Sequence, residues 1–215
     1  MFGKILFSYH DQLVIIWSFI LKIPLSILAY LLTPTLPSKY LLLGCLIHTP
    51  VSIVYHVHKI HKTVFVSALN KADYAFINAM IMFTTYAIGY YTLPNEYHRM
   101  QQIYYCSIAS ILNTMYACST FYKKDRLVRT FLVGCVIVIA VYPVFYSVYV
   151  NGFFLAKWGV FSCLSYIFGG LVWISRFPER RFAPPCLFNS HALMHICIVF
   201  SHLSFYMFIA QSAKV

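Results

Sequence analysis

The chain has 215 residues, of which 61% are hydrophobic and only 10% are charged. A soluble domain carries about 25% charged residues, so a water-soluble fold of this composition would expose large apolar patches and aggregate. The length accommodates seven spanning helices of about 20 residues each and leaves no room for a second folded domain. We therefore expect residues 1–215 to form a single all-α integral membrane domain with seven transmembrane helices.

Seven apolar runs follow one another along the chain, each long enough to cross a membrane. Lipid offers no partner for an unpaired backbone group, so runs of this length are expected to be helices. Pro24, in the first run beside Lys22, predicts a kink, and Pro143 lies near the end of the fifth. The expected spans cover residues 13–32, 40–57, 73–92, 103–121, 127–148, 153–174 and 190–210.

The basic residues divide unequally between the two sides of such a seven-helix chain. Four lie on the side of the C-terminus, namely Lys39, Arg99, Lys157 and Lys214, and Lys22 lies within a span. Eleven lie on the side of the N-terminus: Lys4, Lys59, Lys62, Lys71, Lys123, Lys124, Arg126, Arg129, Arg176, Arg180 and Arg181. Because Lys and Arg concentrate in cytoplasmic loops, we expect a cytoplasmic N-terminus and an outside C-terminus. The same distribution accounts for the net charge of +11 without a nucleic-acid partner.

Two histidines, His191 and His195, are four residues apart at the start of the last expected span. Side chains at this spacing project from one face of a helix, and two imidazoles so placed can bind one Zn²⁺ ion. The glutamate of the H-E-x-x-H motif is missing, because Ala192 stands in its place, so a proton-accepting carboxylate must come from elsewhere. Taken alone, this pair is more often a structural feature than a metal site.

The second and third expected spans carry complementary polar residues. Ser52 and His56 share a helix face near the end of the second span, and Asp73 opens the third. In the expected topology these residues lie at the cytoplasmic side, at a depth similar to that of His191 and His195. Three imidazoles with an open fourth position are typical of a catalytic zinc site. Asp73 would orient the water or accept its proton, and Ser52 would hold a ligand ring or donate to an oxyanion. A polar cluster that only fixes helix packing explains the same residues equally well.

Four short blocks carry a more specific signal. They are Ser-Ile-Val-Tyr-His at 52–56, Lys-Ala-Asp-Tyr at 71–74, Arg-Phe-Pro-Glu-Arg at 176–180 and Asn-Ser-His-Ala-Leu-Met-His at 189–195. These blocks resemble motifs of the progestin and adipoQ receptor family, which includes the adiponectin receptors and the bacterial haemolysin III-like proteins. The family motifs are Ser-x-x-x-His, a Lys-x-Asp-Tyr-like helix start, an Arg-x-Pro-Glu-Arg loop and a Ser-His-x-x-x-His helix.

The resemblance implies both a site and a set of functions. It implies that His56, His191 and His195 bind Zn²⁺ and that Asp73 and Ser52 lie close to the metal. The function expected first is ceramidase-like hydrolysis of a lipid amide or ester, with membrane lipids such as ceramide as partners, or coupling of lipid binding to signalling. A receptor with a structural zinc ion, or a haemolysin-like pore, remains an alternative.

Two further histidines lie within the apolar runs. His48 is on the same helix face as Ser52 and His56, one to two turns deeper. We expect it to be a packed histidine bonded to a neighbouring helix rather than a ligand. We assign no role to His202.

Overall fold

The computed structural model describes residues 12–119, 126–181 and 189–214. These residues form helices and the turns between them, which agrees with the expected all-α class, and this part of the chain contains no strand. The helices are α2 (Leu13–Leu32), α3 (Leu36–Ile60), α4 (Val66–Thr92), α5 (Glu96–Cys118), α6 (Arg126–Ala140), α7 (Tyr142–Asn151), α8 (Phe153–Ser175) and α9 (Ser190–Ser212).

The expected spans lie on these helices, but the helices extend beyond the apolar runs. α2 has the predicted bounds, and α8 and α9 begin at the predicted residues. α3, α4 and α5 begin earlier, because a membrane helix continues through polar residues at its ends, which apolarity does not mark. α3 starts directly after its N-cap residue Thr35, whose side chain accepts a hydrogen bond from the backbone N–H of Ser38. Asn95 caps α5 through the N–H of His98 in the same way. The predicted end of the fourth span at residue 121 lies outside the described residues.

The fifth expected span is two helices, α6 and α7, which meet at Val141. Pro143 has no N–H, so the carbonyl of Ile139 has no donor four residues further on. Gln102 on α5 supplies one, because its side-chain amide donates to the Ile139 carbonyl oxygen. In contrast, the helix continues without a break through Pro24 in α2 and Pro50 in α3.

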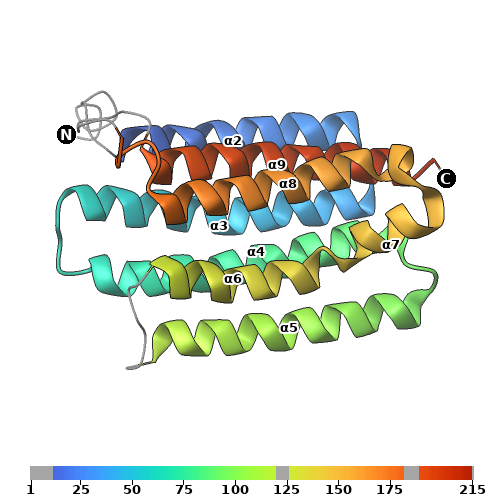
Figure 1. The fold of residues 1–215 in the computed structure, drawn as a ribbon, viewed down its shortest axis with the longest axis horizontal. Coiled ribbons are helices and arrows are strands. Elements are labelled where there is room, and N and C mark those ends of the chain that lie inside the picture. The colour runs from blue at the N-terminus through green and yellow to red at the C-terminus, as the bar shows by residue number, and fades with distance from the viewer. Residues whose placement is uncertain (1–11, 120–125, 182–188, 215) are drawn as a thin grey trace.

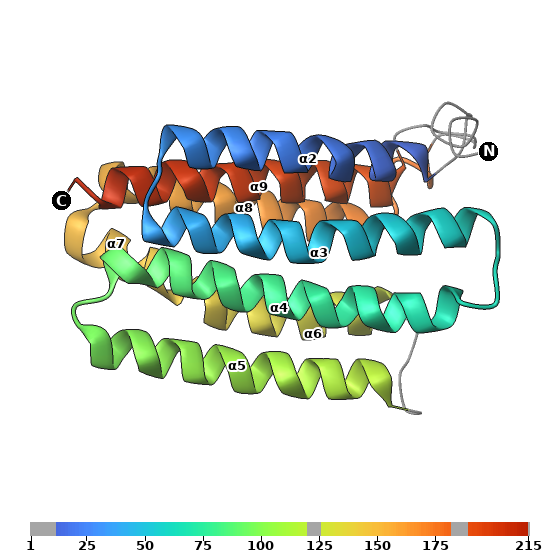
Figure 2. The same cartoon turned by 180° about the vertical axis from the view of Figure 1, so that it is seen from behind.

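The helices lie side by side in a bundle, and successive helices run in opposite directions except α7, which continues in the direction of α6 (Figures 1 and 2). α9 packs against α2, α3, α4 and α8, most extensively against α8. α5 lies at the outer edge, against α4 and α6. Among the described residues, five segments are long and apolar enough to cross a membrane: α2, α3, the α6–α7 pair, α8 and α9.

Small side chains bring α8 and α9 close together. A Cβ atom on Gly159 would lie 3.1 Å from Phe208 Cδ2, and one on Gly169 would lie 3.0 Å from Cys197 Cβ. The hydroxyl of Ser162 on α8 donates to the backbone carbonyl of Ser201 on α9 at 2.9 Å. Close backbone approach through small residues is how helices associate in membranes. This contact fixes α9, and therefore its histidines, against α8.

Candidate metal centre

Three histidines meet at one end of the bundle. α3 ends there at Ile60, and α4 and α9 begin there at Val66 and Ser190; we call this end the histidine end. His56 lies one turn before the end of α3, and His191 and His195 lie in the first two turns of α9. The helices thus bring together imidazoles from two distant parts of the sequence.

The geometry of the three imidazoles suits a single cation. One ring nitrogen from each of His56, His191 and His195 lies within 4.8 Å of the other two. The ring centroids are 5.3 Å apart for His56 and His191 and 5.5 Å apart for His56 and His195. Two nitrogens bound to one tetrahedral Zn²⁺ at about 2.0–2.1 Å would lie about 3.4 Å apart. The observed separations, all within 4.8 Å, exceed this value by no more than about 1.4 Å.

His191 and His195 already point the same ring atom at each other. Their Nε2 atoms are 3.1 Å apart, which requires one imidazole to donate to the other. His195 is buried, and its Nδ1 has no hydrogen-bond partner in the part of the chain that the structure describes. A cation between the two Nε2 atoms would replace this shared proton by two coordination bonds.

The third histidine is held from outside the cluster by Gln12, a residue that sequence reasoning missed. The Nδ1 atom of His56 lies 2.7 Å from the side-chain oxygen of Gln12, which stands just before α2. Gln12 and His56 are both buried. The only signal in the sequence is that Gln12 is a polar residue directly before the first apolar run.

Aromatic rings surround the cluster. Trp173 on α8 has its ring 4.5 Å from the ring of His191. Phe19 on α2 lies 4.7 Å from His195 and 6.0 Å from His56, measured between ring centroids. These rings restrict the rotation of the imidazoles and separate them from water, which strengthens electrostatic interactions inside the site. Sequence reasoning identified neither aromatic residue, because nothing local distinguishes them from the many other aromatic residues of the chain.

Asp73, the expected proton acceptor, lies deeper in the bundle than the end of α3. Its Oδ1 atom is 3.4 Å from Nε2 of His48, and both residues are buried. His48 therefore contacts a neighbouring helix as expected, and its partner is the candidate catalytic carboxylate. Ser52 is buried on α3 one turn from both His48 and His56. From the histidine end into the bundle, α3 thus presents His56, then Ser52, then His48, with Asp73 beside His48.

The loop that follows α8 fixes the start of α9. Glu179 accepts hydrogen bonds from the backbone N–H of Ser190 at 2.8 Å and from its hydroxyl at 2.7 Å. Asn189 accepts one from the N–H of Ala192 at 2.8 Å. These bonds satisfy N–H groups that the first turn of a helix leaves unpaired, and a carboxylate is favourable at the positive end of the helix dipole. They also set the position of His191, the next residue along α9.

A bundle of apolar, span-length helices with its polar residues turned inward defines an integral multi-pass membrane protein. Residues 7–206 match the model of the haemolysin-III related family. The chain belongs to this family, which confirms the resemblance found in the four sequence blocks. No curated protein matches the chain.

Proposed function

We propose that the chain crosses the membrane seven times, with its N-terminus and its histidine end on the cytoplasmic side. α4 and α5 complete the set of spans, because their 27 and 23 residues correspond to about 35–40 Å, more than the hydrocarbon core requires. The unequal distribution of Lys and Arg gives the orientation. The orientation can be tested with a reporter phosphatase that is active only on the non-cytoplasmic side. It is expected to be active when fused after Val215 and inactive when inserted between His61 and Phe65.

We further propose that His56, His191 and His195 hold Zn²⁺ and that the protein hydrolyses a lipid amide or ester. One observation carries this proposal: within the described residues, three histidines offer ring nitrogens to a common point, and no fourth ligand joins them. Structural zinc sites are closed by four protein ligands, whereas catalytic sites use three and keep a position open. Bound Zn²⁺ would supply Lewis acidity to a water molecule or to a substrate carbonyl.

The residues deeper in the bundle supply the remaining functions. Asp73 accepts the proton of the attacking water and passes it to the leaving amine or alcohol. His48, 3.4 Å away, orients that carboxylate. Ser52 donates to the carbonyl oxygen of the substrate as negative charge develops on it. A site buried among apolar helices at the depth of the inner leaflet selects a lipid whose amide or ester lies near the membrane surface.

The test uses the purified protein in vesicles that contain ceramide, with free fatty acid and bound metal measured on the same sample. Wild-type protein is expected to hold about one zinc ion per chain and to release fatty acid. Asp73→Asn should keep the zinc and lose about 10²-fold or more of the rate. Glu96→Gln, at an exposed carboxylate in the first turn of α5, is the matched control and should change neither.

The competing functions give different results in the same experiment. Zinc bound at full occupancy without hydrolysis of any lipid tested would contradict the enzyme and favour a receptor with a structural metal. Release of an entrapped dye from the vesicles, independent of Asp73, would favour a pore.

A further inference from the structure

The side chain of Gln12 determines which nitrogen of His56 carries the proton. Its Oε1 atom lies 2.7 Å from His56 Nδ1, and an amide oxygen can only accept a hydrogen bond. Nδ1 therefore carries the hydrogen and donates it. In a neutral imidazole the lone pair is then on Nε2, so Nε2 is the atom of His56 that can bind a cation.

The same atom is directed into the cluster from the other two histidines. The Nε2 atoms of His191 and His195 face each other at 3.1 Å. With Nδ1 of His56 engaged by Gln12, all three rings offer Nε2, which is a consistent set of donors for one ion.

The position of Gln12 is fixed by the packing of α2. Ile15 and Phe19, in the first two turns of this helix, belong to a buried apolar cluster that includes Ala192 of α9, with Ile53 of α3 packed against it. Phe19 also lies against the rings of His56 and His195. Gln12 is only 4% exposed. A buried polar side chain held at this distance from His56 contributes a fixed hydrogen bond rather than a fluctuating surface contact.

We propose that Gln12 is a positioning residue for the metal centre, acting through His56. It fixes the tautomer and the ring orientation of this ligand and raises the electron density on Nε2. The inference rests on the proposed zinc site but assigns a function to a residue outside it. It also gives the start of α2 a direct role at the metal centre, although α2 contributes no ligand.

The experiment measures zinc affinity of the purified full-length chain in detergent by competition with a chromophoric chelator. Gln12→Met keeps the length of the side chain and suits the apolar surroundings but removes the acceptor. We expect its zinc affinity to fall about 10–100-fold, the usual cost of losing such a hydrogen bond to a ligating histidine. Gln12→Glu restores an acceptor oxygen and should bind zinc at least as tightly as the wild type. Gln101→Ala, which removes an amide that donates to the exposed hydroxyl of Tyr97 on α5, is the matched control and should leave affinity unchanged.

Two further readouts separate positioning from general destabilisation. The visible spectrum of bound Co²⁺ should change in Gln12→Met and return to the wild-type form in Gln12→Glu. Losing a buried hydrogen bond also lowers the unfolding free energy, so Gln102→Leu, which loses the buried bond to the Ile139 carbonyl far from the histidines, is the stability control and should keep wild-type zinc affinity. Wild-type zinc affinity in Gln12→Met, within a factor of about two, would overturn this inference and leave the zinc site standing. A wild-type chain that binds no zinc would overturn the proposed function and this inference together.

Discussion

The α3–α9 side and the α5–α6 side of the bundle both bury polar side chains, but they pair them differently. On the α5–α6 side, Gln102 donates to the carbonyl of Ile139, which has lost its helical donor to Pro143. This amide replaces the backbone donor that Pro143 lacks. On the α3–α9 side, the ring nitrogens of His56, His191 and His195 converge on one another across two helices. We base the proposed metal site on this convergence.

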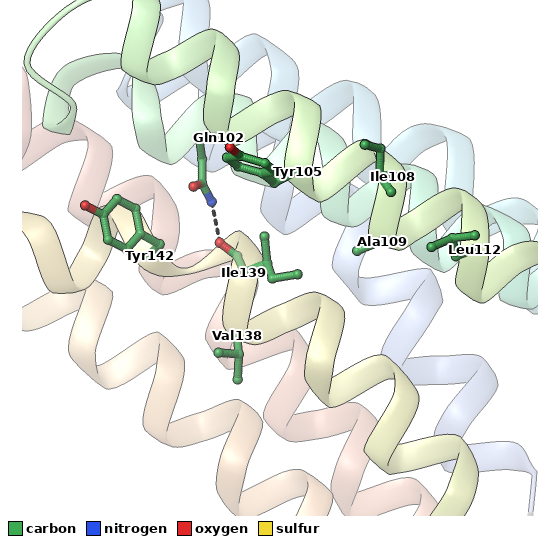
Figure 3. Close-up of a pocket in the computed structure, with 8 residues that line it drawn as sticks. All are labelled: Gln102, Tyr105, Ile108, Ala109, Leu112, Val138, Ile139 and Tyr142. Atoms are coloured by element: carbon green, nitrogen blue, oxygen red, sulfur yellow. Dashed lines mark hydrogen bonds between the residues drawn. The ribbon is translucent and has the colours of Figure 1, made fainter.

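The two sides also differ in how tightly they are packed. Gly159 and Gly169 on α8 leave no space for a methyl group against α7 and α9. Gly134 on α6 has no atom within 4 Å of the position its Cβ would occupy. A groove of about 530 Å³ lies between α5 and α6, with apolar side chains on both walls and Gln102 at one end (Figure 3). The α8 side is therefore closely packed, whereas the groove between α5 and α6 is open.

The largest expected effect is on bound metal. His191→Ala should lower zinc from about one ion per chain to less than about a tenth, because two imidazoles do not hold Zn²⁺ in a catalytic site. Metal analysis of the purified protein measures this. His98→Ala, on an exposed histidine in the first turn of α5, should keep the wild-type content. Equal zinc content in His191→Ala and His98→Ala would show that the histidines of the α3–α9 side do not hold the metal.

Removing the Gln102 hydrogen bond on the α5–α6 side should lower the free energy of unfolding and leave zinc binding unchanged. Gln102→Leu leaves the Ile139 carbonyl without its side-chain donor, and we expect unfolding free energy to fall by about 1–3 kcal/mol with unchanged zinc affinity. The loss should be smaller in a Pro143→Ala background, because the N–H restored at position 143 can donate to Ile139. Unfolding of the four proteins in detergent completes the double-mutant cycle. An identical loss in both backgrounds would contradict the role given to Gln102.

The packing difference can be tested with one added methyl group on each side. Gly159→Ala should destabilise the protein by about 1–2 kcal/mol, because its Cβ would lie 2.8 Å from Val144 Cγ1. Gly134→Ala should be neutral or should stabilise α6 by up to about 1 kcal/mol, since alanine favours the helix and meets no neighbour. Thermal unfolding of the pair compares them directly. Similar shifts would show that α8 and α6 are packed alike.

The smallest effect is expected for the hydrogen bond between α8 and α9. Ser162→Ala removes the donor to the Ser201 carbonyl, and such bonds between membrane helices contribute about 0.6 kcal/mol on average. The same unfolding assay measures the loss, with Ser165→Ala as the control, because Ser165 donates to the carbonyl of Phe161 within its own helix. A loss above about 2 kcal/mol would mean that packing by small residues alone does not hold α8 to α9.

The positions of most helices and several residues of the candidate site could be predicted from the sequence. The bounds of α2 and the first residue of α9 follow from local apolarity, and the shared face of His191 and His195 follows from their spacing within one helix. Family membership was indicated by four short blocks and confirmed by the match over residues 7–206. The early start of α5 behind its Asn95 cap and the break at Val141 were missed, because a hydropathy pattern does not record helix caps or lost backbone donors.

The sequence by itself determined that this protein is a helical membrane protein whose histidines at 191 and 195 share a helix face. Those properties depend on residues within a turn or a span of one another. The resemblance already placed His56 with them, and the structure brings the three rings together. Only the tertiary structure decided that Gln12 lies against Nδ1 of His56, that Trp173 and Phe19 surround the rings, and that Asp73 lies beside His48. These contacts join different helices, and they depend on how each helix is rotated and shifted against its neighbours.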